Sequence, residues 1–165
     1  MKGGVNMDSL ANRLNNRPIL ASIHTEAFRH NLRRIRDLAP QSKIWSVVKA
    51  KAYGHTLEAA LQGLESTDGF ALLDIAEAQW LRDHGWSGRI LLLEGLFHRS
   101  ELDLALKLRC DLVVHSDKQV EWLESHQNHD DHPINLFLKL NSGMNRLGFR
   151  PSQYRTAFHR LHAAG

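Results

Sequence analysis

Five short apolar runs, separated by longer stretches with helical spacing, constrain the fold of this 165-residue chain most strongly. Several runs are apolar almost throughout, which is typical of strands that are buried on both faces. They recur every 20 to 26 residues, counted from their first residues. This alternation predicts βα units around a parallel sheet. The predicted strands are Ile44 to Val48, Phe70 to Ile75, Ile90 to Glu94, Asp111 to His115 and Ile134 to Leu140.

Helix-start and helix-stop residues flank these runs. Thr25 is predicted to cap a first helix, which Pro40 then ends. Ser116 and Gln119 are spaced as a capping box after the fourth strand, and Ser152 is expected to open the last helix. The first helix should present one apolar face, made of Phe28, Leu32, Ile35 and Leu38.

This cadence suits either a (β/α) barrel or a doubly wound sheet, and the pattern alone does not choose between them. Both architectures bind ligands at the carboxyl ends of the strands, so the residues there are the first candidates for function. The 42% apolar content is enough for one domain core. Residues 1–17 lie outside the pattern and are expected to form a flexible extension, leaving 18–165 as the folded part.

Composition excludes several functional classes. The net charge is +3, but lysines and arginines alternate with acids, so no basic stripe for nucleic acid is predicted. No apolar run approaches the ~20 residues of a membrane span. The amino terminus lacks the apolar core of a secretory signal, which makes the cytoplasm the expected compartment. The single cysteine, Cys110, allows no internal disulfide and is predicted to be a buried structural thiol.

Three of the 11 histidines, His126, His129 and His132, lie close together in one polar segment. Asn128 and two aspartates share that segment. Structural metal sites normally use cysteines or ligands that ordered elements hold in place. A solvated loop is therefore the prediction, and no metal is expected.

Lys49 follows the first apolar run, in the sequence WSVVKAKAYGH, where a strand delivers side chains into a site. Burial disfavours the charged form of an amine, and a second cation nearby adds to this effect, so such a lysine can attack an aldehyde. If strand geometry continues, Lys49, Lys51 and Tyr53 share one face. Position alone also allows both lysines simply to leave the strand for solvent.

The run VVKAKAYGH resembles the pyridoxal-phosphate motif of alanine racemases, usually VVKANAYGH, and follows an APxxK lead-in, here Ala39 to Lys43. The similarity extends through RPILASI, HNLRRIR, DGFALLDIAEAQWLRDHG, ILLLEGLF, LVVH and LKLNSGMNRLGF, from Arg17 to Gly165. VVKAKAYGH and SGMNRLGF are its most specific parts. The resemblance implies a (β/α)8 TIM-type barrel, of which about the first five βα units are present, and an interconversion of L-alanine and D-alanine for peptidoglycan.

Residue by residue, the resemblance implies roles for four side chains. Lys49 matches the lysine that holds pyridoxal 5′-phosphate as a Schiff base and also acts as one of two acid/base groups. Tyr53 matches a tyrosine that contacts the cofactor phosphate. Arg146 matches an arginine near the phenolic oxygen of the cofactor and the substrate carboxylate, two anions that suit its forked donors. Lys139 matches a lysine that is carbamylated in some members, although an ordinary strand-end lysine is an equal expectation.

The sequence also departs from the family pattern. Lys51 stands where asparagine is usual, Thr56 where glycine is usual, and His24 and Asn141 where aspartates are common. No residue matches the second acid/base group, which by resemblance is a tyrosine from a carboxyl-terminal β-rich domain of a second subunit. The sequence therefore reads as part of a homodimeric enzyme and is expected to be inactive alone.

Two other functions stay open at this stage. One is another amino-acid racemase or a decarboxylase on the same barrel, although decarboxylases share only a shorter lysine motif. The other is a noncatalytic pyridoxal-phosphate homeostasis protein, which consists of a single barrel without a second domain. Substrate profiling tests the first alternative, and the sequence that follows the eighth βα unit tests the second.

Overall fold

The computed structural model describes residues 21–126 and 134–164. The expected extension over residues 1–17 and two of the clustered histidines, His129 and His132, lie outside the described residues. His126 is described, and its ring Nδ1 lies 3.8 Å from a carboxylate oxygen of Asp103. Within the described ranges, no group of three or more His, Cys, Asp or Glu side chains could hold a metal ion.

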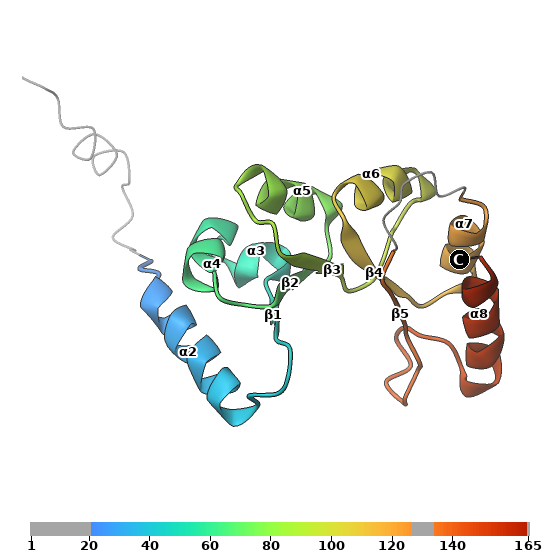
Figure 1. The fold of residues 1–165 in the computed structure, drawn as a ribbon, viewed down its shortest axis with the longest axis horizontal. Coiled ribbons are helices and arrows are strands. Elements are labelled where there is room, and N and C mark those ends of the chain that lie inside the picture. The colour runs from blue at the N-terminus through green and yellow to red at the C-terminus, as the bar shows by residue number, and fades with distance from the viewer. Residues whose placement is uncertain (1–20, 127–133, 165) are drawn as a thin grey trace, which may run out of the picture.

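Five parallel strands form one sheet in the order in which they occur along the chain. This sequential order fits a barrel, because the strand order of a doubly wound sheet reverses at a switch point. The strands follow an arc in Figure 1 and form part of a (β/α) barrel. They are β1 (Trp45–Val47), β2 (Gly69–Leu72), β3 (Arg89–Leu92), β4 (Cys110–Val114) and β5 (Leu136–Leu138).

Helices lie along the outer side of this arc (Figure 1). They bury a core against the sheet that includes Val48, Phe70, Leu72, Ile90, Leu92 and Leu112. The helices are α2 (Thr25–Leu38), α3 (Lys49–Tyr53), α4 (Leu57–Gly63), α5 (Ile75–Asp83), α6 (Leu102–Lys107), α7 (Asp117–Glu124) and α8 (Pro151–Ala163), with a 3-10 turn at Arg99–Glu101.

The opposite face of the sheet carries a second, smaller cluster. Ala71, Leu91 and Val113, one residue from each central strand, pack there with Trp45 of β1. The rings of Trp45 and Phe137 from β5 also form a T-shaped pair, with 6.2 Å between ring centroids. Since β1 and β5 are the two outer strands, this contact shows that the sheet curves strongly enough for their side chains to meet. The inner face is therefore concave.

A polar cluster lies on the same side of the strands. The Arg89 guanidinium donates to Asp111 Oδ2 at 2.8 Å and lies over the Trp45 ring. The Asn135 amide donates to Asp111 Oδ1 at 2.9 Å. Asp111 is only 4% exposed, so both of its carboxylate oxygens have partners despite burial. The cluster joins β3, β4 and the segment leading into β5.

All five predicted strands are confirmed, but the expected end of the second strand is wrong. β2 ends at Leu72, and Ile75 already belongs to α5. Asp74 causes this early change, because its carboxylate accepts a hydrogen bond from the Ala76 backbone and caps the helix. An apolar run that crosses a helix cap thus resembles a longer strand in the sequence.

The helix positions are largely confirmed, whereas the proposed caps are wrong. Thr25 is the first helical residue of α2, and His24 occupies the cap position without a side-chain bond. Ser116 precedes α7 without capping it. Gln119 accepts from the backbone of His115, one residue earlier than a capping box requires. The last helix begins at Pro151, one residue before Ser152.

Only part of the predicted apolar face of α2 is buried. Leu32 is 3% exposed, but Ile35 is 50% and Leu38 is 77% exposed. α2 approaches α4 closely at Phe28, where a Cβ on Gly63 would lie 2.8 Å from the Phe28 side chain. The far end of α2 extends away from the helices that cover the sheet (Figure 1), which explains why its apolar residues find no cover among the described residues.

Cys110 is 4% exposed in β4, which confirms the prediction of a buried thiol. Burial raises its pKa to about 12, because the surrounding apolar atoms disfavour the thiolate. The thiol is therefore unreactive near neutral pH. Among the described residues, no helix has the length and apolar character needed to cross a membrane.

Candidate active site at the carboxyl ends of the strands

The chain changes conformation abruptly after β1. Val48 still donates to the Ala71 carbonyl of β2, but four consecutive residues, 50–53, then have φ angles of 52° to 53°. Each left-handed L-residue costs roughly 1–2 kcal/mol, so such a run persists only where its surroundings hold it. Strand geometry does not continue past Val48, so the condition under which Lys49, Lys51 and Tyr53 would share a strand face is not met.

Hydrogen bonds from several directions hold this left-handed turn. Ala52 donates to the Val48 carbonyl at 2.8 Å, and Thr56 donates to the Lys51 carbonyl at 3.1 Å. The His55 ring bonds the Ala52 carbonyl through Nδ1 at 2.8 Å, so this nitrogen carries the proton. The backbone N–H of Lys51 donates to Glu77 Oε1 of α5 at 2.9 Å. The turn is thus tied both to itself and to the neighbouring βα unit.

The two candidate cofactor residues of this turn have no polar partners in the described part of the chain. The side chain of Lys49 is half-buried and makes no hydrogen bond or ion pair there. Tyr53 is 70% exposed, and its hydroxyl is likewise unbonded within the described ranges. An amine and a phenol at the end of a barrel strand are thus both available to a ligand.

A closed loop follows β5 and carries the other two candidates. Lys139 donates from its backbone to Val114 of β4, and its carbonyl accepts from Phe149 at 2.9 Å. The backbone N–H of Asn141 donates to the Phe149 carbonyl at 2.9 Å, which closes the loop at its base. A Cβ on Gly148 would lie 2.7 Å from the Asn141 nitrogen, so only glycine permits this closure. Arg146 is exposed on this loop.

Asn141 organises the loop from within. Its side-chain oxygen accepts from the backbones of Gly143 and Asn145, both at 3.1 Å. Its amide nitrogen donates to the Asn145 side chain at 2.9 Å. An aspartate, common in the family at this position, could accept the same two backbone bonds. The loop that carries Arg146 is thus compatible with either residue.

The parallel order of the strands brings all four candidates to one edge of the sheet. Lys49 and Tyr53 follow β1, while Lys139 and Arg146 follow β5. Their strands meet across the concave face through Trp45 and Phe137. Among the described residues, no hydrogen bond or ion pair joins the four candidates to one another. Three cationic side chains and one phenol therefore lie at this edge of the sheet, and none of them is bonded to another.

Comparison with known proteins identifies the family. The family described as "Alanine racemase, N-terminal domain" matches residues 23–165. The chain belongs to this family. It is 54% identical over 147 residues to an alanine racemase of Methylibium petroleiphilum and 52% identical to one of Delftia acidovorans. These matches cover 89% of the chain and 40% of either relative, so the chain spans about two-fifths of their length.

Solved alanine racemase structures share the fold. The enzyme from Acinetobacter baumannii aligns with a TM-score of 0.82 at 36% identity, over 87% of this chain and 40% of that one. The biosynthetic alanine racemase from Pseudomonas aeruginosa aligns with a TM-score of 0.82 at 42% identity, over 89% of this chain and 41% of that one. Both matches support the assignment of the fold as the amino-terminal barrel region of the alanine racemase family.

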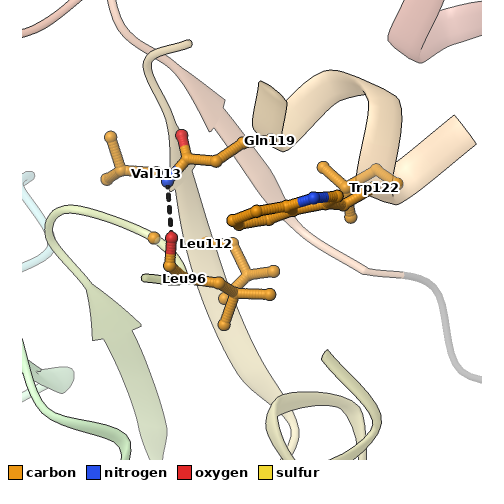
Figure 2. Close-up of a pocket in the computed structure, with 7 residues that line it drawn as sticks. Leu96, Leu112, Val113, Gln119 and Trp122 are labelled. Atoms are coloured by element: carbon orange, nitrogen blue, oxygen red, sulfur yellow. Dashed lines mark hydrogen bonds between the residues drawn. The ribbon is translucent and has the colours of Figure 1, made fainter. Parts of the chain in front are cut away.

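Gln119 links the ends of β3 and β4 and was missed as a site residue by sequence reasoning. Its amide donates to the carbonyls of Glu94 at 2.8 Å and Leu96 at 3.1 Å, while its oxygen accepts from His115. Figure 2 shows the bond to Leu96 among the residues that line a small pocket, to which Gln119 and Trp122 of α7 contribute. The other residues that line this pocket are apolar or glycine: Gly95, Leu96, Leu112, Val113, Trp122 and Leu123. The side chain therefore fixes two carboxyl-end loops.

Replacing Gln119 with leucine should destabilise the protein by about 2–3 kcal/mol, because three backbone groups would lose their partner. Urea denaturation of the complete native protein measures this loss. Gln79→Leu is the matched control, since Gln79 bonds only Asp83 on its own helix, and surface changes usually stay within about 0.5 kcal/mol. Equal effects of the two substitutions would contradict the role given to Gln119.

Thr56 has a backbone conformation that family members with glycine can adopt without strain. Its φ of 68° and ψ of 151° lie in a region that is almost restricted to glycine. The hydroxyl partly compensates, because it accepts from the Ala59 backbone at 3.3 Å and caps α4. Threonine at this position therefore introduces backbone strain but also supplies a helix cap.

Thr56→Gly should stabilise the protein by about 1 kcal/mol. Strain relief of roughly 1–3 kcal/mol exceeds the few tenths lost with the cap and the added entropy of an unfolded glycine. Thr56→Ser is the control, since it keeps both the hydroxyl and a Cβ and should behave like the wild type. If urea denaturation shows the glycine variant to be no more stable than the serine variant, Thr56 is not strained.

Proposed function

We propose that this chain is the amino-terminal barrel part of a pyridoxal-phosphate-dependent alanine racemase that interconverts L-alanine and D-alanine. One observation carries the proposal: a lysine without a polar partner in the described ranges lies on a strained turn at the carboxyl end of β1. Strained backbone clusters at functional sites, and barrel enzymes act at this edge of the sheet. The names of the relatives support the substrate.

The residues at this edge fit the chemical groups of pyridoxal 5′-phosphate. Lys49 would hold its aldehyde, and the exposed hydroxyl of Tyr53 would donate to its phosphate. Arg146 would donate to its phenolic oxygen and to the substrate carboxylate. The donor set is complementary to an aldehyde and several anionic oxygens, and no carboxylate within the described residues pairs with it.

When bound, this cofactor draws electrons away from the α-carbon of an amino acid, so that the α-proton can be removed. Lys49 would then move that proton at its Nζ on one face of the substrate. Racemisation needs a second proton-transfer group on the opposite face. We propose that this group is a tyrosine from a second subunit of a homodimer, in a region beyond the two-fifths of the relatives that the chain spans.

Arg146 binds best when its guanidinium is fixed. We propose that a carbamylated Lys139 orients it, since carbamylation turns a cation into an anion. The closed loop after β5 supports this role, because Lys139 forms its base and Arg146 lies on it. We propose that the reaction takes place in the cytoplasm and supplies D-alanine for peptidoglycan.

Lys49→Ala should abolish attachment of the cofactor and lower racemisation by at least about 10³-fold, as expected for loss of a proton-transfer group. The complete native protein is reduced with borohydride in the presence of pyridoxal 5′-phosphate, and the labelled peptide is mapped. Lys51→Ala is the matched control and should keep label on Lys49. Label on Lys51 in the wild type would refute the assignment, and cofactor attachment without racemisation would favour a homeostasis protein.

Carbamylation of Lys139 predicts a mass higher by one CO₂ in the intact protein, measured under mild conditions with bicarbonate. The increment should disappear in Lys139→Gln and after acid treatment, because carbamates decompose in acid. An unchanged mass in bicarbonate would show that Lys139 is an ordinary lysine at the end of its strand.

A further inference from the structure

We propose that Glu77 is a positioning residue that directs Lys49, rather than Lys51, toward the cofactor. The proposal rests on the proposed function. Glu77 lies in the first turn of α5, the helix that follows β2. Its Oε1 accepts the backbone N–H of Lys51 at 2.9 Å, across 26 residues of sequence. The residue thus acts on the turn through the main chain.

The second carboxylate oxygen of Glu77 indicates that this contact is not simply a convenient stabilising bond. Oε2 is buried and has no hydrogen-bond partner among the described residues. A desolvated carboxylate oxygen without a donor is costly, and such groups are uncommon in native proteins. A glutamate with such an oxygen is expected only where its other oxygen makes a bond that a shorter or apolar side chain could not make. Here that bond is the one from Oε1 to the Lys51 backbone.

That task follows from the conformation of the turn. Lys51 has a φ of 52°, and L-residues relax from this region toward right-handed or extended backbone unless they are held. The other bonds of the turn arise from the N–H groups of residues 52 and 54–56. Two of these bonds, from Gly54 and Thr56, end on the Lys51 carbonyl. The Glu77 carboxylate instead accepts the Lys51 N–H and ties the turn to another element, and a charged acceptor makes the stronger kind of hydrogen bond.

Two amines compete for one aldehyde at this position. Lys49 is half-buried, whereas Lys51 is exposed. A turn that relaxes around Lys51 would free both side chains to change direction and would remove this difference. Glu77 ties the backbone of α3 to α5 and thereby keeps Lys49 in the site and Lys51 in solvent. The carboxylate therefore sets which lysine reacts, without contacting the cofactor.

The test compares Glu77→Ala, Glu77→Gln and a matched control, Gln79→Ala, in the complete native protein. The glutamine variant keeps an oxygen that accepts from Lys51. Gln79 lies on the same helix and bonds only Asp83. Two readouts are used: hydrogen exchange of the Lys51 amide without cofactor, and the distribution of borohydride-reduced pyridoxal phosphate between Lys49 and Lys51 by peptide mapping.

Glu77→Ala should speed exchange of the Lys51 amide at least about tenfold, slow labelling of Lys49 by a similar factor and place label on Lys51, as expected for loss of a charge-assisted hydrogen bond. Glu77→Gln and Gln79→Ala should label Lys49 alone. A general loss of folding would spread label over many lysines, whereas loss of positioning should share it between Lys49 and Lys51. The specific result is therefore label that moves in part from Lys49 to Lys51 in Glu77→Ala but stays on Lys49 in Glu77→Gln.

The positioning role is overturned if Glu77→Ala exchanges its Lys51 amide and labels Lys49 as the wild type does. It is also overturned if labelling falls without any share on Lys51. Failure of the proposed function looks different, since the wild type itself would then carry no label on Lys49. Hydrogen exchange would in that case still decide whether Glu77 holds the turn.

Discussion

The left-handed turn after β1 is the constraint on which the candidate site depends. Four consecutive L-residues occupy a backbone region that each would avoid alone. The turn ends the strand before Lys49 and takes the chain directly into α4, so the lysine lies at the rim of the sheet and not within it. A bond to Val48 just after β1, bonds within the turn and the bond to Glu77 of α5 together compensate for the strain.

The sheet supplies the frame for this rim. Its parallel strands bring β1 and β5 to the same edge, and the contact between Trp45 and Phe137 shows how far it curves. Buried polar groups fix the connections, with Gln119 joining the loops after β3 and β4 and the base of the Arg146 loop paired to Phe149. Rigid connections allow short loops to present side chains with defined directions.

The sequence alone predicted the five strands, their cadence and the family, because apolar periodicity and a long motif are local signals. It did not predict the left-handed turn, since an apolar strand followed by KAKAY reads as a continuing strand. The contact of Glu77 was also missed, and Gln119 was predicted only as half of a capping box, not as a link between two loops. Each looks like an ordinary residue in the first turn of a helix, and the bonds that tie them to neighbouring βα units span more than 20 residues. The apolar pattern alone left a barrel and a doubly wound sheet open, and the sequential strand order fits the barrel that the family resemblance implied.

The most direct test of Lys49 as the cofactor lysine is the electron density in a crystal of the complete native protein grown with pyridoxal 5′-phosphate. Continuous density should run from Lys49 Nζ to the cofactor at the carboxyl edge of the sheet. Residues 50–53 should stay left-handed, and the Lys51 amide should still face Glu77. Cofactor density joined to Lys51, or a lysine-free cofactor elsewhere on the barrel, would contradict this assignment.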